Sequence, residues 1–199
     1  MSRHSDERQK ELHIAPMMSG TTREMRELMR ILSRRMVLWT EMVADQTAIH
    51  ASHLGHVLGH CTMAGDGSKE DDAQHPIVCQ LGGCQGSRLF EATLLVQRYG
   101  DYDEVNLNCG CPSDRVTGKE EFGAVLMKKI EVAEAAIEAM VEAATALERS
   151  PRISIKCRVG VDDHDTVEHL TEFISRMTKH TKIFYLHARK AVLGGILTT

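Results

Sequence analysis

Tyr102-Asp-Glu-Val-Asn-Leu107 is followed directly by Asn108-Cys-Gly-Cys-Pro-Ser-Asp-Arg115. The first segment predicts a buried strand, and the second predicts a turn that carries an amide, a thiol and a guanidinium on Asn108, Cys111 and Arg115. A purely structural turn needs only the Gly and the Pro. Because α/β enzymes hold their reacting groups at the carboxyl ends of strands, this turn is predicted to be a catalytic loop.

Strands and helices are predicted to alternate on both sides of this loop. Apolar runs predict strands at 12–17, 36–42, 77–81, 104–107, 153–158 and 183–187. Helices are predicted at 22–33, 87–99, 131–147 and 166–178, with Thr22 as the N-cap of the first. Another helix is expected within 48–61, before a stretch at 62–73 with the composition of a surface loop. Such alternation is typical of a parallel sheet covered by helices.

The composition is that of an ordinary globular protein of 199 residues. Its net charge of −4 argues against non-specific binding of nucleic acid by the whole surface. Six Cys occur without a C-x-x-C pair, which favours reduced thiols in an intracellular compartment. We expect no secretory leader in the polar N-terminus and no membrane span, because no apolar window approaches ~20 residues. These features predict a cytoplasmic protein and leave an organellar location open.

Five segments resemble, in order and spacing, the tRNA-dihydrouridine synthases and specifically their A-type branch. The loop segment is Asn106-Leu-Asn-x-Gly-Cys-Pro-Ser-Asp-Arg-Val116, followed by Phe122-Gly-Ala-x-Leu-Met127. The others are Ile14-Ala-Pro-Met17, Thr40-Glu-Met-Val43, His75-Pro-Ile-Val-Cys-Gln-Leu-Gly-Gly83, and Ile155-Lys-Cys-Arg-Val-Gly-Val-Asp-Asp163 with Leu186-His-Ala-Arg-Lys190. The resemblance covers residues 12 to 193. Within the loop, Gly118-Lys-Glu-Glu121 is longer and more acidic than the family pattern.

The resemblance implies an α/β fold, namely a (β/α)8 TIM barrel of the FMN-oxidoreductase type. Residues 1–11 would be a polar N-terminal extension, and 12–199 an incomplete barrel of about six strands. The family's C-terminal helical RNA-binding domain would be absent. Because a full barrel takes about 250 residues, we expect a truncated chain, or a subunit that a partner completes if the short form is real.

The resemblance also implies a chemistry: FMN-dependent reduction of uridine to 5,6-dihydrouridine in the tRNA D-loop, with NADPH as the reductant. Cys111 would be the general acid that protonates uracil while reduced flavin delivers hydride. A packed thiol in a Gly-Cys-Pro turn is the structural alternative, and Cys109 is expected to be such a packing residue. FMN would be bound by Pro16, Met17, Gln80, Asn108, Lys156 and His187, and tRNA by Arg115, Arg158 and Arg189.

Some interpretations stay open. Barrel flavoproteins commonly hold the phosphate after strands seven and eight, which this chain lacks, so we expect the chain alone to bind FMN weakly or not at all and to be inactive. The alternatives are a non-catalytic barrel fragment that binds RNA or a partner subunit, and an FMN barrel acting on a small molecule. Arg23, Arg26 and Arg30 share a helix face, which is either a phosphate-contacting stripe or a solvated surface.

A histidine cluster raises the question of a metal. Its spacing allows zinc geometrically, but no C-x-x-C pair or acidic ligand completes the set, so surface histidines are favoured and no metal is expected. The cluster comprises His53, His56, His60 and Cys61.

Overall fold

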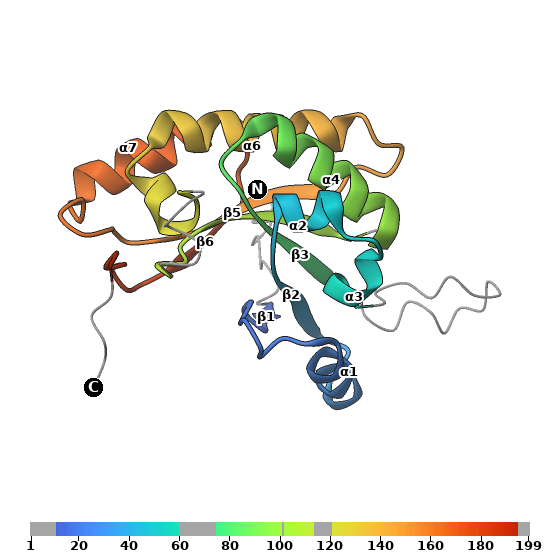
Figure 1. Cartoon of the computed structure of the whole chain (residues 1–199). Helices are drawn as coiled ribbons and strands as arrows, with labels where there is room; N and C mark the ends of the chain where they lie inside the picture. Colours follow the sequence, from blue (N-terminus) through green and yellow to red (C-terminus); the bar gives the residue numbers. More distant parts are fainter. Residues whose placement is uncertain (1–10, 60–74, 101, 114–120, 195–199) are drawn as a thin grey trace, which may run out of the picture.

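The computed structural model describes residues 11–59, 75–100, 102–113 and 121–194. Six parallel strands form one sheet in the order of the chain: β1 (Leu12–His13), β2 (Met36–Ala44), β3 (Ile77–Gly82), β4 (Glu104–Cys109), β5 (Arg152–Arg158) and β6 (Phe184–His187). The sheet curls as it twists (Figure 1). This is the strand order of a (β/α)8 barrel, so the predicted fold class is confirmed for six successive strands.

Helices connect the successive strands. They are α1 (Arg23–Leu32), α2 (Asp45–His50), α3 (Leu54–Leu58), α4 (Gly86–Gly100), the 3-10 helix η2 (Gly123–Met127), α6 (Ile130–Thr145) and α7 (Val167–Met177). Figure 1 shows α4, α6 and α7 above the sheet at the top of the view, and α1 at the bottom of the view, below β2. Threonine hydroxyls begin two helices: Thr22 accepts from the backbone N–H of Met25 at 3.4 Å, and Thr166 from that of His169 at 3.2 Å.

Two of the predicted elements differ from the structure. The first strand spans only two residues instead of 12–17, because the chain leaves the sheet before Pro16, which has no N–H to donate. The helix expected within 48–61 is divided into α2 and α3, since Ala51 takes an extended conformation between them. Residues 60–73 of that region lie outside the described residues.

The larger hydrophobic core lies between the sheet and its covering helices. Val105, Leu107 and Cys109 alternate along β4 toward it, and all three are fully buried. From α6, small side chains such as Ala133 and Ala136 meet this layer and are also fully buried. Small residues on a helix allow a close approach to the sheet, so the Ala-rich sequence of α6 fits its place in the fold.

The concave face of the sheet is polar. Glu104, Asn106 and Asn108 occupy the alternate positions of β4 and therefore share this face. Gln80 of β3 and Ser154 of β5 stand opposite Asn106 in the strand register. All five side chains are buried. A small apolar cluster completes this side, and it consists of Val37, Trp39, Val78 and Tyr185.

The arginines of α1 do not form the expected basic face. Arg26 is buried, and its guanidinium donates to the backbone carbonyls of Thr21 at 2.8 Å and Leu58 at 2.6 Å. Arg30 is buried as well and donates to carbonyls at the start of β2 and just before β3. Only Arg23 of the three is exposed. For Arg26 and Arg30 both sequence interpretations, an RNA stripe and a solvated surface, were wrong.

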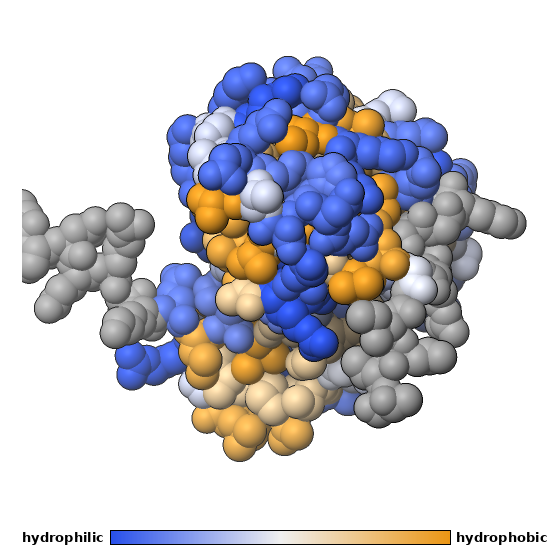
Figure 2. All heavy atoms as spheres, turned by 90° about the vertical axis from the view of Figure 1, so that its left-hand side faces the viewer, coloured by the Kyte–Doolittle hydropathy of each residue, from blue (hydrophilic) through white to orange (hydrophobic). Residues whose placement is uncertain are grey.

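Apolar side chains of α1 face outward instead. Leu28, Ile31 and Leu32 are 50%, 82% and 66% exposed. Figure 2 shows hydrophobic side chains gathered over the lower part of one face of the molecule, at the level where Figure 1 places α1. In the part of the chain that the structure describes, no helix has the length and hydrophobicity needed to span a bilayer.

Candidate functional site

A cavity of about 250 Å³ lies at the carboxyl ends of the strands. It brings together residues from β2, β3, β4, β5 and β6 and from the loops that follow β1 and β4. Its lining consists of Pro16, Met18, Met42, Gln80, Asn108, Gly110, Cys111, Pro112, Lys156, Arg158 and His187. The predicted catalytic residue thus shares one cavity with all but one of the predicted cofactor-binding residues.

Asn108 fixes the start of the Cys111 loop. Its side-chain oxygen accepts the backbone N–H of Gly110 at 3.0 Å and that of Cys111 at 2.9 Å. Its amide nitrogen donates to Gln80 Oε1 at 2.8 Å. A single side chain therefore ties the loop to the neighbouring strand. An amide suits this strand end because its oxygen accepts from the loop while its nitrogen donates to Gln80.

Two further contacts hold the same loop. The Arg158 Nε–H donates to the carbonyl of Gly110 at 2.6 Å, and the N–H of Ala124 donates to the carbonyl of Cys111 at 2.9 Å. Arg158 also reaches the carbonyl of Arg189 at 3.4 Å. The backbone around Cys111 is thus held from β4, β5 and η2, so the position of its thiol is set by the fold.

Positive charge gathers beside the thiol. Burial lowers the pKa of Lys156 below its usual value, and the neighbouring Arg158 lowers it further. The pKa of His187 is lowered by loss of solvent and by Arg158, Lys156 and Arg189, which favours the neutral imidazole. A site with several cations and a neutral imidazole is suited to an anionic or electron-rich group.

The cysteines of this region differ in their surroundings. Cys109 and Cys157 are fully buried, and burial raises the pKa of both thiols, that of Cys157 to about 12. Cys111 is only partly buried and lines the cavity. The expectation that Cys109 is a packing residue is confirmed, and Cys111 is the thiol that a bound molecule would meet.

The sequence model of the dihydrouridine synthase (Dus) family matches residues 13–195. The chain belongs to the dihydrouridine synthase family. A tRNA-dihydrouridine(20/20a) synthase of Escherichia coli O6:H1 is 37% identical over 185 residues, 92% of this chain and 50% of the relative. Proteins of the same name from Shigella flexneri and Vibrio parahaemolyticus are 36% identical, over 92% and 93% of this chain and 49% and 52% of theirs. The chain spans about half the length of these relatives.

The structure changes one detail of the predicted lining. Met18, and not Met17, lies against the cavity, where it is joined by Met42. The backbone of Met17 is occupied by the turn that follows β1, because its N–H and carbonyl both bond to Thr21. A role for Met17 in cofactor binding stays a prediction. Met42 lies in a segment that carried the family resemblance, which was a usable signal for it.

The predicted RNA-binding arginines have different positions. Arg158 lines the cavity, Arg189 is exposed in the loop after β6, and Arg115 lies outside the described residues. The structural role of Arg158 in holding Gly110 had no signal in its local sequence, since it depends on the loop after β4 coming within reach of β5.

The histidine cluster does not assemble a metal site within the described ranges, where no group of three or more potential ligands comes together. The rings of His53 and His56 contact each other edge to face, with centroids 5.6 Å apart. His60 and Cys61 fall outside the described residues.

Proposed function

We propose that this chain carries the flavin- and uridine-binding site of a tRNA-dihydrouridine synthase, which reduces uridine to 5,6-dihydrouridine in the D-loop of tRNA. The observation that carries the proposal is the single cavity that joins Cys111 with Gln80 and Lys156. The relatives' names support tRNA as the substrate. Since the chain spans half of each relative, the activity of the whole protein is part of the proposal.

The donor set of the cavity fits the polar edge of FMN. Gln80 and Asn108 offer amide groups, and Lys156 offers a cation that favours the electron-rich reduced ring. Held by these residues, FMN would supply a hydride for uracil C6, and NADPH would be its source of electrons. Pro16 would contact the ring together with Met18, which takes the cavity position predicted for Met17, and His187 would hold the ribityl-phosphate side.

Cys111 has the role of proton donor in this proposal. Its Sγ holds a proton in the cavity and transfers it to C5 of the uracil, which leaves a thiolate on the protein. Lys156 interacts electrostatically with Cys111, so its positive charge stabilises that thiolate as it forms. The loop contacts made by Asn108 and Arg158 keep the thiol in place during the transfer.

The tRNA would be contacted on the rim of the same cavity. Arg189 is exposed there, Arg158 is partly exposed, and Arg115 follows Cys111 in the sequence. Arg26 and Arg30 are excluded from this role by their burial. We also propose residues 12–199 as the barrel portion after an N-terminal extension at 1–11, and the cytoplasm as the place of action.

The test is single-turnover reduction of an unmodified tRNA transcript by the chain in excess reduced FMN, with dihydrouridine measured by mass spectrometry. The excess flavin compensates for weak binding. We expect no product from the chain without added flavin, and product from the wild-type chain when reduced FMN is in excess. Under the second condition Cys111→Ser should lose about 10²–10⁴-fold, the range for removal of a general acid. Cys84→Ser is the matched control, because Cys84 is also partly exposed but does not line the cavity. Tight tRNA binding without product would instead favour a non-catalytic RNA-binding role.

A further inference from the structure

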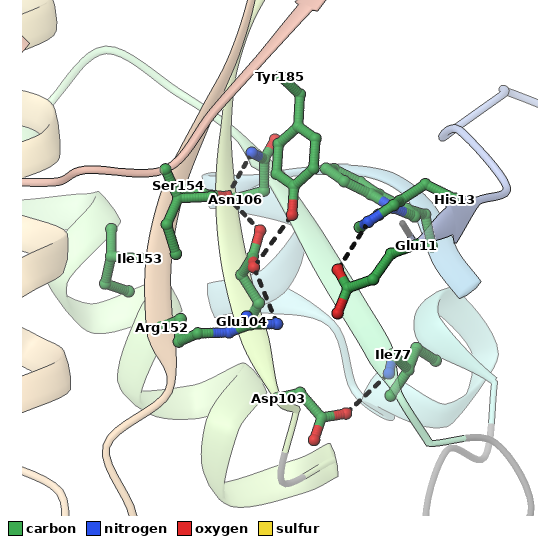
Figure 3. A network of polar contacts seen from close by, with 12 residues as sticks. Glu11, His13, Ile77, Asp103, Glu104, Asn106, Arg152, Ile153, Ser154 and Tyr185 are labelled. Carbon is green, nitrogen blue, oxygen red and sulfur yellow. Dashed lines mark hydrogen bonds and ion pairs between the residues drawn. The ribbon is translucent and has the colours of Figure 1, made fainter. Parts of the chain in front are cut away.

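A carboxylate is buried on the concave face of the sheet, away from the thiol. Glu104 at the start of β4 is fully buried. Its Oε1 accepts the hydroxyl of Ser154 at 2.5 Å, and its Oε2 accepts the hydroxyl of Tyr185 at 3.2 Å. The guanidinium of Arg152 lies 3.4 Å from Oε2 (Figure 3). The proposed chemistry does not use this group, and a buried acid needs a reason.

Hydrogen bonds link Glu104 to the cavity through a row of side chains that we call the amide row: Ser154, Asn106, Gln80 and Asn108. Asn106 Nδ2 donates to Ser154 Oγ at 2.7 Å, and Gln80 Nε2 donates to Asn106 Oδ1 at 2.8 Å. Asn108 Nδ2 donates to Gln80 Oε1, also at 2.8 Å. Every donor in the row points the same way, toward the carboxylate, and two members of the row line the cavity.

The cavity end of the row has only one workable direction. Asn108 Oδ1 accepts two backbone N–H groups, from Gly110 and Cys111. If the amide of Asn108 turned over, its NH2 group would face these two donors and no hydrogen bond could form. Its Nδ2 must therefore face Gln80, which must present Oε1 in return. Asn108 therefore requires each following amide to point the same way.

The surroundings of Asn106, in the middle of the row, favour the opposite orientation of its amide. If the amide of Asn106 turned over, its Oδ1 would accept the hydroxyl of Ser154 at 2.7 Å and the backbone N–H of Lys156 at 3.2 Å. Its Nδ2 would then oppose the Nε2 of Gln80, 2.8 Å away. The neighbours of Asn106 thus favour one orientation, and the loop of Cys111 requires the other. An acceptor at the end of the row away from the cavity, which accepts the hydrogen bond of the Ser154 hydroxyl, determines which of these two orientations Asn106 adopts.

We propose that Glu104 is a positioning residue: its carboxylate accepts the hydrogen bond of Ser154, so that Asn106 keeps the orientation that Gln80 and Asn108 require, and these two amides stay in place at the cavity. The inference rests on the proposed function, because the groups concerned are those that would meet the flavin. Glu104 acts only through the row and touches no substrate.

Protonation of Glu104 is the event that would release the row. A protonated carboxyl can donate to Ser154, and Ser154 then needs an acceptor, which the turned-over Asn106 supplies. Burial raises the pKa of Glu104, while Ser154, Arg152, Tyr185 and His13 oppose that rise. The other charged groups of this corner are Glu11, which contacts His13, and Asp103, which contacts His75.

The test is a pH titration of the isotopically labelled chain by NMR, without flavin. The side-chain amide signals of Gln80, Asn106 and Asn108 are expected to move with the same midpoint as the carboxyl carbon of Glu104. In Ser154→Ala the carboxyl still titrates, but the amides no longer follow. Asp103→Asn is the matched control, because Asp103 is the adjacent carboxylate and makes no contact with the row; co-titration should persist there.

Glu104→Gln gives a second test that needs no titration. The side-chain oxygen of Gln would face the two donors, Tyr185 and Arg152, so its nitrogen would face Ser154. Asn106 would then turn over to accept from Ser154, and its Nδ2 would oppose the Nε2 of Gln80. We expect the three amide signals to shift, and FMN affinity to fall about tenfold, the loss of one hydrogen bond.

The outcomes separate the two proposals. Amide signals that stay in place in Glu104→Gln, or that ignore Glu104 in the wild type, would overturn the role of Glu104. Shifted signals with unchanged FMN affinity would overturn its effect on the flavin. A wild-type chain that binds no FMN even when the flavin is in large excess, while the amides still follow Glu104, would count against the proposed function alone.

Discussion

Replacement of Asn108 tests the structural basis of the site quantitatively. Asn108→Ala removes three hydrogen bonds: two from the N–H groups of Gly110 and Cys111 and one to Gln80. At about 1 kcal/mol each, the free energy of unfolding should fall by about 3 kcal/mol. The loss is concentrated at the loop, because the Oε1 of Gln80 and the two N–H groups all lose their partner at once.

Asn108→Asp is the matched variant. It keeps an oxygen for Gly110 and Cys111 but sets a second oxygen against the Oε1 of Gln80, so its cost should be confined to that contact and be about 1–2 kcal/mol. Urea unfolding followed by circular dichroism gives both values. The rate at which Cys111 is alkylated gives a second readout, which should rise in Asn108→Ala and not in Asn108→Asp. Equal destabilisation by both variants, within about 0.5 kcal/mol, would refute the reasoning.

Three further changes test other parts of the structure. Gly82→Ala places a Cβ 2.5 Å from Cε2 of Phe122 and should lower thermal stability by about 1–3 kcal/mol, measured by calorimetry; a neutral result would mean that the ring moves freely. Arg26→Met removes two hydrogen bonds to buried carbonyls and should lower the free energy of unfolding, measured in urea, by about 3–5 kcal/mol. Its affinity for tRNA should not change, because Arg26 is buried. Arg176 lowers the pKa of Glu134 to about 2, so the Glu134 carboxylate contributes its full stabilisation above pH 4.5 and loses it as the pH falls toward 2. Glu134→Gln should therefore make the free energy of unfolding depend less on pH between about pH 5 and pH 2, as measured by urea unfolding at several pH values.

The order of elements could be predicted because local signals and the fold agree. The helices at 23–32, 86–100, 130–145 and 167–177 lie within two residues of their predicted bounds. Residues at strand ends could also be assigned to one site, since parallel strands bring their carboxyl ends to one edge of the sheet. Gln80, Asn108 and Lys156 accordingly meet in one cavity, as the sequence led us to expect.

The environment of α1 could not be predicted from its own sequence. Helical periodicity puts Arg26 and Arg30 on a polar face, but their guanidinium groups are needed by backbone carbonyls far along the chain, such as that of Leu58. Leu28 and Leu32, which the same periodicity marks as apolar contacts, are exposed. Long-range partners decided both cases, and a local pattern carries no information about them.

The polar face of β4 had a signal that was not used. Glu104, Asn106 and Asn108 alternate with apolar residues, which is the period of a strand with two different faces. Recognition of this pattern would have placed Glu104 on the same face as the cavity residues. Its partners Ser154 and Tyr185 come from later strands, so the network itself required the structure.

Protection of Cys111 by FMN tests most directly whether the cavity is the flavin site. The alkylation rates of Cys111 and Cys84 would be measured by peptide mass spectrometry over a range of FMN concentrations. Cys84 serves as the internal control, because it is partly exposed and does not line the cavity. The account predicts that FMN slows alkylation of Cys111 in a saturable way and leaves Cys84 unchanged. Flavin that binds without protecting Cys111, or protects both thiols equally, would contradict it.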